Sequence, residues 1–405
     1  MCQRSDVTYQ HIHPSGIQRW LRPMRPRDPE EDHRPSTPLE LFFDLVFVVA
    51  VAQAANSLHH ALAEGGSVGA PVGKYILVFF GIWWAWMNFS WFASAYDTED
   101  IAYRLIVFVQ MTGALIYAAG IPRAFEDLDF GVAVLGYVVM RLAQVSHWLR
   151  ASAGAEPGRR TCARRYAIGI TACQIGWIAM LALPSPWEIA GFLLLGLCEL
   201  LVPLWAERVG ATSWHASHIT ERYGLFTIIV LGESILAGTV AIQTVLDEGG
   251  LDVELVGIIA GGLLLVFSMW WVYFDYQVPE LLTSSRVAFR WGYGHLVIFA
   301  SIAAVGAGLV VAVDHAAGHG HVGDVRAGMI VAVPVAVYLL ALWSLHFLVG
   351  EPGAASSKYV APVAAVLVLL AALTPQPVLL IGLIVAGMVT FKVARRVRLS
   401  ERPAR

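Results

Sequence analysis

Long apolar stretches separated by short polar connections run along the chain from Leu39 to Val397. The hydrocarbon core of a bilayer is about 30 Å thick, so a helix needs about 20 predominantly apolar residues to cross it. The pattern predicts an all-α, polytopic transmembrane helical bundle of about twelve spans, near residues 39–62, 74–96, 101–121, 130–150, 163–183, 187–207, 221–243, 253–277, 289–313, 326–349, 359–374 and 377–397. Between the last two, Leu373-Thr374-Pro375-Gln376-Pro377 is either a tight turn between two short spans or a kink in one re-entrant segment.

The composition is that of a chain solvated largely by lipid. Hydrophobic residues make up 57% of the 405 residues and charged residues only 14%, and the mean hydropathy is +0.64. One soluble core cannot hide so much apolar surface. The four cysteines have no C-x-x-C spacing, so we expect no disulfide framework, metal site or cofactor. The net charge of −3 gives no reason to expect a nucleic acid partner.

The distribution of Lys and Arg predicts the orientation of the helices. Short cytoplasmic loops of membrane proteins carry an excess of these residues. When alternate connections are assigned to the cytoplasm, the opposite side holds only Lys74, Arg123 and Arg326. This sorting predicts an even number of spans in the plasma membrane, with both termini cytoplasmic. The expected organisation is a poorly ordered cytosolic arm rich in Arg and Pro (1–35), two six-helix halves (36–210 and 211–398) and a cytosolic tail (399–405).

Three short matches between the halves predict an internal repeat. They pair Trp83-Trp84-Ala85-Trp86 with Trp270-Trp271-Val272-Tyr273, Ala102-Tyr103-Arg104 with Ala288-Phe289-Arg290, and His147-Trp148-Leu149 with His346-Phe347-Leu348. Because six helices separate equivalent elements, the two halves would point the same way through the membrane as parallel six-helix repeats. Transporters are often built from such repeats, with a pathway at their interface.

Polar residues inside the predicted first span are unexpected in a membrane. A charge at mid-bilayer costs at least roughly 2.5 kcal/mol, so it needs a partner, water or a function. Glu40 and Asp44 are four residues apart and share a helix face near the cytoplasmic end, whereas Gln53, Asn56 and His60 form a second, nearly opposite seam. Two polar seams predict a helix at the centre of the bundle.

Deeper in the membrane, the sequence places two carboxylates against one guanidinium. Glu199 and Glu233 are predicted near mid-depth, as is Arg141. Arg141 is expected to pair with one of the two, which leaves the other able to bind a proton or a cation. For each of these three residues, two interpretations remain open: a member of a structural ion pair, or a functional group. Further candidates for an ion or solute pathway are Glu221, Ser234 and His147.

Nearer the cytoplasm, several charged side chains are predicted at similar depth. They form either a gate-like ion-pair cluster or a set of interfacial anchors: Asp44, Asp275, Arg104, Arg222 and Arg290. No G-x-x-x-x-G-K-[ST], H-E-x-x-H or G-x-S-x-G motif occurs in the sequence. We therefore expect neither ATP-driven transport within this chain nor an enzyme, and no catalytic residue is predicted.

Two long segments resemble the signatures of the bacterial low temperature requirement protein A family. They are Thr37-Pro38-Leu39-Glu40-Leu41-Phe42-Phe43-Asp44-Leu45-Val46-Phe47 and Glu221-Arg222-Tyr223-Gly224-Leu225-Phe226-Thr227-Ile228-Ile229-Val230-Leu231-Gly232-Glu233-Ser234. The resemblance covers roughly residues 34 to 398 and implies a multi-pass protein of the bacterial inner membrane. It implies no biochemical activity.

A looser similarity concerns Phe42-Phe43-Asp44-Leu45-Val46-Phe47-Val48-Val49-Ala50, which resembles the F-S-D-x-V-F-A-I-A helix of endo-lysosomal potassium channels. That family is built from six-helix repeats. The chain departs from the motif at Phe43, which replaces its serine, and the motif does not recur in the second half.

Three functions remain open from sequence. The leading hypothesis is a secondary or proton-linked transporter of an unknown small solute or cation, because mid-membrane carboxylates lie in a two-half bundle. The first alternative is a potassium-like cation channel, and the second is a membrane-embedded enzyme or sensor. The lipid bilayer is the expected partner, and a homo-oligomer is compatible with the pattern.

Overall fold

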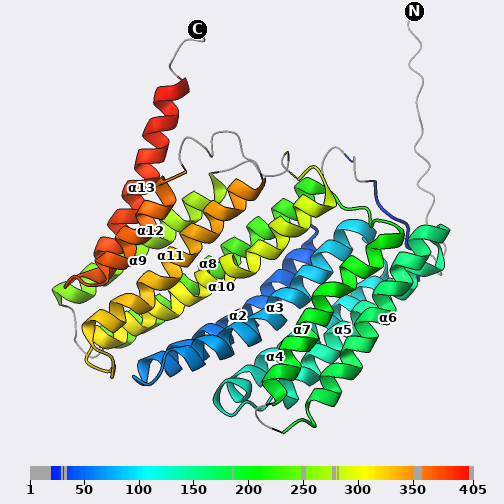
Figure 1. The fold of residues 1–405 in the computed structure, drawn as a ribbon, viewed down its shortest axis with the longest axis horizontal. Coiled ribbons are helices and arrows are strands. Elements are labelled where there is room, and N and C mark those ends of the chain that lie inside the picture. Colours follow the sequence, from blue (N-terminus) through cyan, green and yellow to red (C-terminus); the bar gives the residue numbers. More distant parts are fainter. Residues whose placement is uncertain are drawn as a thin grey trace, which may run out of the picture.

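The computed structural model is entirely helical over the residues that it describes, which are 20–28, 31, 34–184, 187–247, 252–275, 280, 282–349 and 358–400. No strand occurs in these ranges. The elements, in the labels of Figure 1, are α2 (Pro38–Ala63), α3 (Gly69–Tyr96), α4 (Ile101–Glu126), α5 (Gly131–Ala153), α6 (Pro157–Met180), α7 (Trp187–Ala206), the short 3₁₀ helix η1 (Glu207–Val209), α8 (Ala216–Asp247), α9 (Val253–Phe274), α10 (Ser285–Ala316), α11 (Asp324–Val349), α12 (Val360–Ala371) and α13 (Pro377–Ser400).

Ten of these helices are long and apolar enough to cross a membrane. The prediction of about twelve spans is confirmed in part, because α6 and α12 are not among these ten helices. Helix α6 is long enough, but Arg159, Arg160, Arg164 and Arg165 lower the hydropathy of its first turns. Helix α12 has only 12 residues, or about 18 Å at 1.5 Å per residue, which is well short of the hydrocarbon thickness. A turn at residues 372–376 separates α12 from α13, so this region is a helix pair and not one kinked helix.

The helices form two groups that lie side by side, α2–α7 and α8–α13 (Figure 1). In the first group, α2 contacts α3 and α4, and the chain then packs in order through α5, α6 and α7. In the second group, α8 contacts α9 and α10, and the chain continues in order through α11, α12 and α13, which returns to pack on α9. The two groups meet where α2 and α3 contact α8 and α10.

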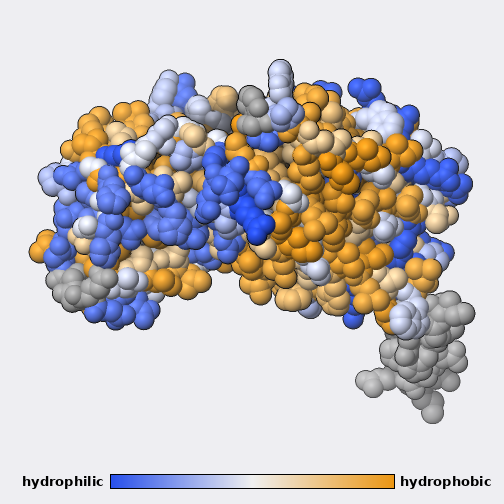
Figure 2. Space-filling model, turned by 90° about the horizontal axis from the view of Figure 1, so that it is seen from below, coloured by the Kyte–Doolittle hydropathy of each residue, from blue (hydrophilic) through white to orange (hydrophobic). Residues whose placement is uncertain are grey.

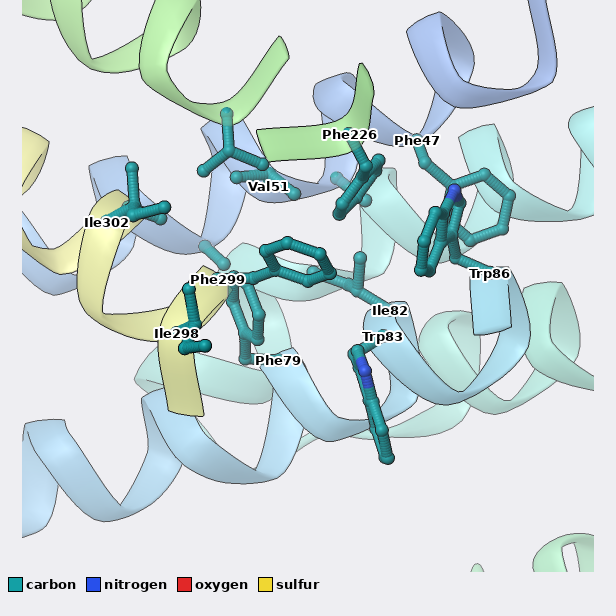
Figure 3. Close-up of a cluster of buried hydrophobic side chains, with 14 of the residues drawn as sticks. Phe47, Val51, Phe79, Ile82, Trp83, Trp86, Phe226, Ile298, Phe299 and Ile302 are labelled. Carbon is teal, nitrogen blue, oxygen red and sulfur yellow. The ribbon is translucent and has the colours of Figure 1, made fainter. Parts of the chain in front are cut away.

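Large apolar side chains fill this junction between the groups (Figure 3). Each group supplies aromatic rings, and Trp86 of α3 stacks on Phe226 of α8 with ring centroids 4.4 Å apart. Phe299 of α10 meets both rings at near right angles. All of the labelled residues are at most 1% exposed: Phe47, Val51, Phe79, Ile82, Trp83, Trp86, Phe226, Ile298, Phe299 and Ile302. The middle of the junction is therefore a dry, close-packed core.

The outward surface of the bundle is apolar where lipid is expected. Seen from below in Figure 2, hydrophobic side chains cover much of the right-hand part of the molecule, where the helices of the first group lie. Exposed large residues on α6 and α7 include Ile168, Ile175, Leu193, Leu194 and Leu197. A soluble monomer rarely exposes so large an apolar surface, so this surface fits contact with a bilayer.

The described part of the N-terminal arm packs against the bundle. The Arg34 guanidinium donates hydrogen bonds to the carbonyl oxygens of Ala93 and Ser94 at the end of α3. The Arg27 N–H donates to the carbonyl oxygen of Ala95. These carbonyls lack partners within the helix, and a cation is favourable at the negative end of the helix dipole. Residues 1–19 of the predicted arm and 401–405 of the predicted tail lie outside the described residues.

Candidate functional site

A group of four buried ionisable side chains joins the two halves at one end of the junction, and we call it the junction cluster: Glu40, Asp44, His218 and Arg222. An Nη atom of Arg222 lies 2.5 Å from Asp44 Oδ1, and the other lies 3.4 Å from Glu40 Oε1. The His218 Nε2 atom lies 3.1 Å and 3.3 Å from the two carboxylate oxygens of Glu40. Each of the four residues is at most 1% exposed.

Local helix geometry explains why these four side chains meet. Glu40 and Asp44 are four residues apart on α2, and His218 and Arg222 are four residues apart on α8, so each pair lies on one helix face. The capping box at the start of α2 also fixes Glu40, because its carboxylate accepts a hydrogen bond of 2.8 Å from the N–H of Thr37. The first turns of α2 and α8 therefore present matching pairs of opposite charge to each other.

The hydrogen bonds around the junction cluster are incomplete. Asp44 Oδ1 accepts from Trp86 Nε1 at 2.7 Å, and Arg222 donates to Ser90 Oγ at 3.2 Å. However, Asp44 Oδ2, Arg222 Nε and His218 Nδ1 are buried and have no hydrogen-bond partner. Buried polar atoms are nearly always paired in proteins. Atoms without a partner also occur around Glu199 and at His147, so they do not by themselves distinguish the junction cluster.

The charges of the junction cluster do not balance. With both carboxylates ionised and His218 neutral, two negative charges face one guanidinium among the members of the cluster. The buried Arg34 acts on Glu40 from outside the cluster, and its own charge is opposed by Asp97 at 3.9 Å. An uncompensated charge in a membrane interior is costly, so the cluster becomes neutral only when it takes up one proton, on His218 or on a carboxylate. The arrangement can therefore bind a proton reversibly without any other partner.

A second buried cluster lies within the first half, and we call it the Glu199 cluster. The Oε2 atom of Glu199 accepts from Arg141 at 2.8 Å and from Trp84 Nε1 at 3.0 Å. Its Oε1 atom accepts from Gln174 at 3.0 Å and from Tyr137 at 3.2 Å. Helices α3, α5, α6 and α7 are thus tied together by one carboxylate with four donors, and its charge is balanced by Arg141.

Of the two predicted partners of Arg141, Glu199 is the one that pairs with its guanidinium. Glu233 lies only partly buried on α8, and no hydrogen bond or ion pair is seen for it among the described residues. Ser234, beside it, donates to the carbonyl oxygen of Ile302 on α10. Glu233 is therefore the mid-membrane carboxylate without a guanidinium.

The other residues of the predicted gate lie outside the junction cluster. Asp275 is not part of the junction cluster, because it forms a bidentate pair with Arg396 of α13 at 2.9 Å. Arg104 and Arg290 are exposed. Of the predicted gate, only the contact between Asp44 and Arg222 is found, because the remaining groups lie on faces of their helices that point away from the junction.

The second seam of α2 does not face the interior of the bundle. Gln53 is partly buried, whereas Asn56 and His60 are exposed. Helix α2 buries the face that carries Glu40, Asp44 and Phe47 instead. The second seam therefore does not contribute to the interior, although α2 contacts helices of both halves, as expected for a helix at the centre of the bundle.

His147 is buried without any hydrogen bond. Its ring lies between Phe92 and Tyr103, with centroid distances of 5.1 Å and 4.8 Å. Neither ring nitrogen has a hydrogen-bond partner. It lies apart from both clusters, so the structure does not bring it together with Asp44 or Glu233.

Sequence reasoning missed several partners of the charged residues, namely His218, Ser90, Trp86, Trp84, Tyr137 and Gln174. His218 had a detectable signal, because it precedes Arg222 by four residues just as Glu40 precedes Asp44. Trp84 and Trp86 belong to the predicted internal repeat, but the repeat gives no indication that they donate hydrogen bonds to carboxylates. The described residues contain no group of three or more His, Cys, Asp or Glu side chains suited to a metal ion.

The fold and the two buried clusters define a polytopic α-helical membrane protein. Residues 35–393 match the family described as Bacterial low temperature requirement A protein (LtrA), and the chain belongs to this family. It is 28% identical over 303 residues to an uncharacterized protein of Rhizobium meliloti (strain 1021), a match that covers 70% of this chain and 69% of that protein. No solved structure matches the chain.

Proposed function

We propose that this chain is a proton-linked secondary transporter of the plasma membrane, with the junction cluster as its proton-binding element. The observation that carries the proposal is the ratio of two carboxylates to one guanidinium in a dry site between α2 and α8. In this proposal the cluster takes up a proton from one side of the membrane and returns it to the other.

The position of the junction cluster suggests how protonation moves the protein. Arg222 belongs to the second half and both carboxylates belong to the first, so the strength of their attraction holds the halves together at this end. A proton on Asp44 removes one of the two charges that hold Arg222. Protonation therefore weakens the contact between halves, and solute binding and release follow from that movement.

Matching helix neighbours support the proposed repeat. The order of packing from α4 to α7 in the first half recurs from α10 to α13 in the second, and α2 and α8 each contact the next two helices. The aromatic matches differ in environment, however, because Trp83 and Trp84 are buried whereas Trp270 and Trp271 are 45% and 47% exposed. In the proposal, the two halves share a topology but have diverged in their roles.

The channel alternative has less support. It requires an ion path along Val46 to Ala50 of α2, but Phe47 and Ala50 are each 1% exposed and are packed against the other half. An enzyme or sensor is also less favoured, because His147, Asp44 and Glu233 do not converge on one site.

Infrared difference spectroscopy on the full chain in lipid nanodiscs tests the proton-binding element without knowledge of the solute. Titration between about pH 5 and about pH 8 is expected to show a protonated-carboxyl band that Asp44→Asn or Glu40→Gln removes. Asp275→Asn is the matched control, since its pair with Arg396 lies at the surface. A spectrum in which neither cluster substitution removes a carboxyl band and His218→Gln removes no imidazole band would overturn the proposal.

Transport is tested in proteoliposomes that contain a pH-sensitive dye. A panel of alkali cations, amino acids, carboxylates and amines is added outside, and at least one class is expected to move protons in the wild type but not in Asp44→Asn. Solute flux that does not respond to an imposed proton gradient would count decisively against proton linkage.

A further inference from the structure

The second half contains a cavity of about 340 Å³ at the same end of the bundle as the junction cluster, and we call it the inner cavity. Its volume lies within the range of small-molecule sites. Helices α8, α9, α10 and α11 each contribute to its wall. The lining residues are Ser217, Thr220, Glu221, Gly224, Tyr273, Phe274, Trp291, His295, Leu342, Leu345 and His346.

The chemistry of this wall favours a positive charge. The wall includes oxygen acceptors, namely the Glu221 carboxylate and the hydroxyls of Ser217 and Thr220. It also includes the aromatic residues Trp291 and Tyr273, and aromatic rings attract cations. No Lys or Arg lines the cavity among the described residues. A carboxylate together with aromatic rings is a combination that binds amines and guanidines.

Glu221 retains acceptor capacity within this site. One of its carboxylate oxygens accepts a hydrogen bond of 3.2 Å from the N–H of Ser36, and no contact is seen for the other among the described residues. A carboxylate accepts through two oxygens, so it has room for an N–H donor from a ligand. Lys392, the basic residue that interacts with His346, does not line the cavity.

His295 is held as a fixed element of the wall and not as a competing charge. Its Nδ1 atom lies 2.8 Å from the carbonyl oxygen of Trp291, which only accepts, so Nδ1 carries the proton. Its Nε2 atom lies 3.0 Å from Tyr273 Oη. Because the ring is 1% exposed, burial disfavours its charged form, and Nε2 of the neutral ring accepts from that hydroxyl. The neutral imidazole therefore orients Tyr273 without adding a positive charge.

We propose that the inner cavity binds a small organic monocation, a primary amine or a guanidine, whose N–H groups pair with Glu221 while its carbon body lies against Trp291 and Tyr273. The substrate role of this ligand rests on the proposed transport function, whereas its binding does not. Glu221 and Arg222 are consecutive residues of α8, and their side chains point about 100° apart around the helix, one toward the inner cavity and one into the junction cluster. Bound cation and bound proton would then act on the same turn of α8.

Calorimetric titration of the full chain in nanodiscs at constant neutral pH tests the inference with three probes of nearly equal shape: benzylammonium, benzyl alcohol and benzoate. Benzylammonium is expected to bind at least roughly tenfold more tightly than benzyl alcohol, and benzoate more weakly than either. Glu221→Gln keeps the shape of the side chain and should weaken benzylammonium at least roughly tenfold while leaving benzyl alcohol unchanged.

Glu254→Gln is the matched control, because Glu254 lines a different cavity at the opposite end of the same half. Equal binding of all three probes, or unchanged benzylammonium binding in Glu221→Gln, would overturn the inference. The test is independent of proton coupling. If the protein binds benzylammonium through Glu221 but shows no titrating carboxyl band, the cation site stands and the proposed proton-linked mechanism is overturned. If it shows the carboxyl band but does not bind benzylammonium through Glu221, the proton-binding element stands and the cation site is overturned.

Discussion

The junction cluster and the Glu199 cluster are both buried inside the helix bundle, yet they differ in charge balance and in the number of donors around their carboxylates. Glu199 has one guanidinium and four donors for its two oxygens. In the junction cluster, two carboxylates share one guanidinium, and Asp44 Oδ2 has no hydrogen-bond partner. Both clusters contain buried polar atoms without a hydrogen-bond partner, among them Arg141 Nε and Gln174 Oε1 in the Glu199 cluster. The difference is that only the junction cluster has more carboxylates than guanidinium groups among its members.

The positions of the clusters match this difference. All members of the Glu199 cluster belong to helices of the first half, so its bonds hold one rigid unit together. The junction cluster lies between the halves, where a change in charge alters the contact between two units. A buried ion pair is weak evidence for stability by itself, so balance and position are the better guides to function. We therefore assign a structural role to the Glu199 cluster and a proton-binding role to the junction cluster.

The largest expected effect is that of Arg141→Met. Removing the guanidinium leaves Glu199 as an unpaired charge in a dry interior, and breaking a buried pair in this way costs about 3–5 kcal/mol of unfolding free energy. The double substitution Arg141→Met with Glu199→Gln removes both charges and should recover most of that loss. Thermal and denaturant unfolding in detergent measure both variants. A single variant as stable as wild type would mean that Glu199 does not depend on Arg141, and the structural role would be lost.

Most of the helices could be predicted from the sequence, and so could the two possible partners of Arg141, but not which of the two it contacts. Hydropathy located the spans to within a few residues, and helix depth reduced the partners of Arg141 to Glu199 and Glu233. Depth alone does not tell which way a side chain points around the bundle. That direction depends on packing between helices far apart in the sequence, and it separates Glu199, which faces Arg141, from Glu233.

The same limit explains the failures. The polar seam of Asn56 and His60 and the candidate Asp275 have the right depth, but their helices rotate them away from the junction. The 12 residues of α12 were apolar enough to suggest a span, yet hydropathy does not fix where a helix ends. The docking of the arm depends on carbonyl oxygens exposed at the end of α3, which are backbone groups with no signature in the sequence.

An intermediate effect is expected at Asp97, outside the spans and beside the arm. Its side chain is 3% exposed and lies 3.9 Å from Arg34. Burial first, and then the charge of Glu40, raise the pKa of Asp97 from 3.8 to about 6. The folded state therefore binds a proton more tightly than the unfolded state, and stability falls as pH rises from about 4 to about 6.

The variant Asp97→Asn removes that penalty. We expect it to raise the unfolding free energy by about 1–2 kcal/mol near pH 8 and to have no stabilising effect near pH 4. Melting temperatures across this pH range measure the effect, with Glu126→Gln, an exposed residue at the far end of α4, as control. Because Glu40 contributes to the raised pKa, Glu40→Gln should shift the transition to lower pH. A pH-independent effect of Asp97→Asn would show that the pKa of Asp97 is not raised, and an unchanged transition in Glu40→Gln would show that the charge of Glu40 does not act on Asp97.

The smallest effect on stability is expected for Asp44→Asn, and it is the sharpest test of the comparison. The substitution leaves Glu40 and Arg222 as a balanced pair, and the amide oxygen still accepts from Trp86 and Arg222. The unfolding free energy should therefore stay within about 1 kcal/mol of wild type, whereas Glu199→Gln leaves Arg141 unpaired and should cost about 3 kcal/mol. Parallel unfolding of the two variants at neutral pH provides the measurement. If Asp44→Asn destabilises the protein as much as Glu199→Gln, Asp44 is a structural partner of Arg222, and the excess carboxylate has no functional meaning.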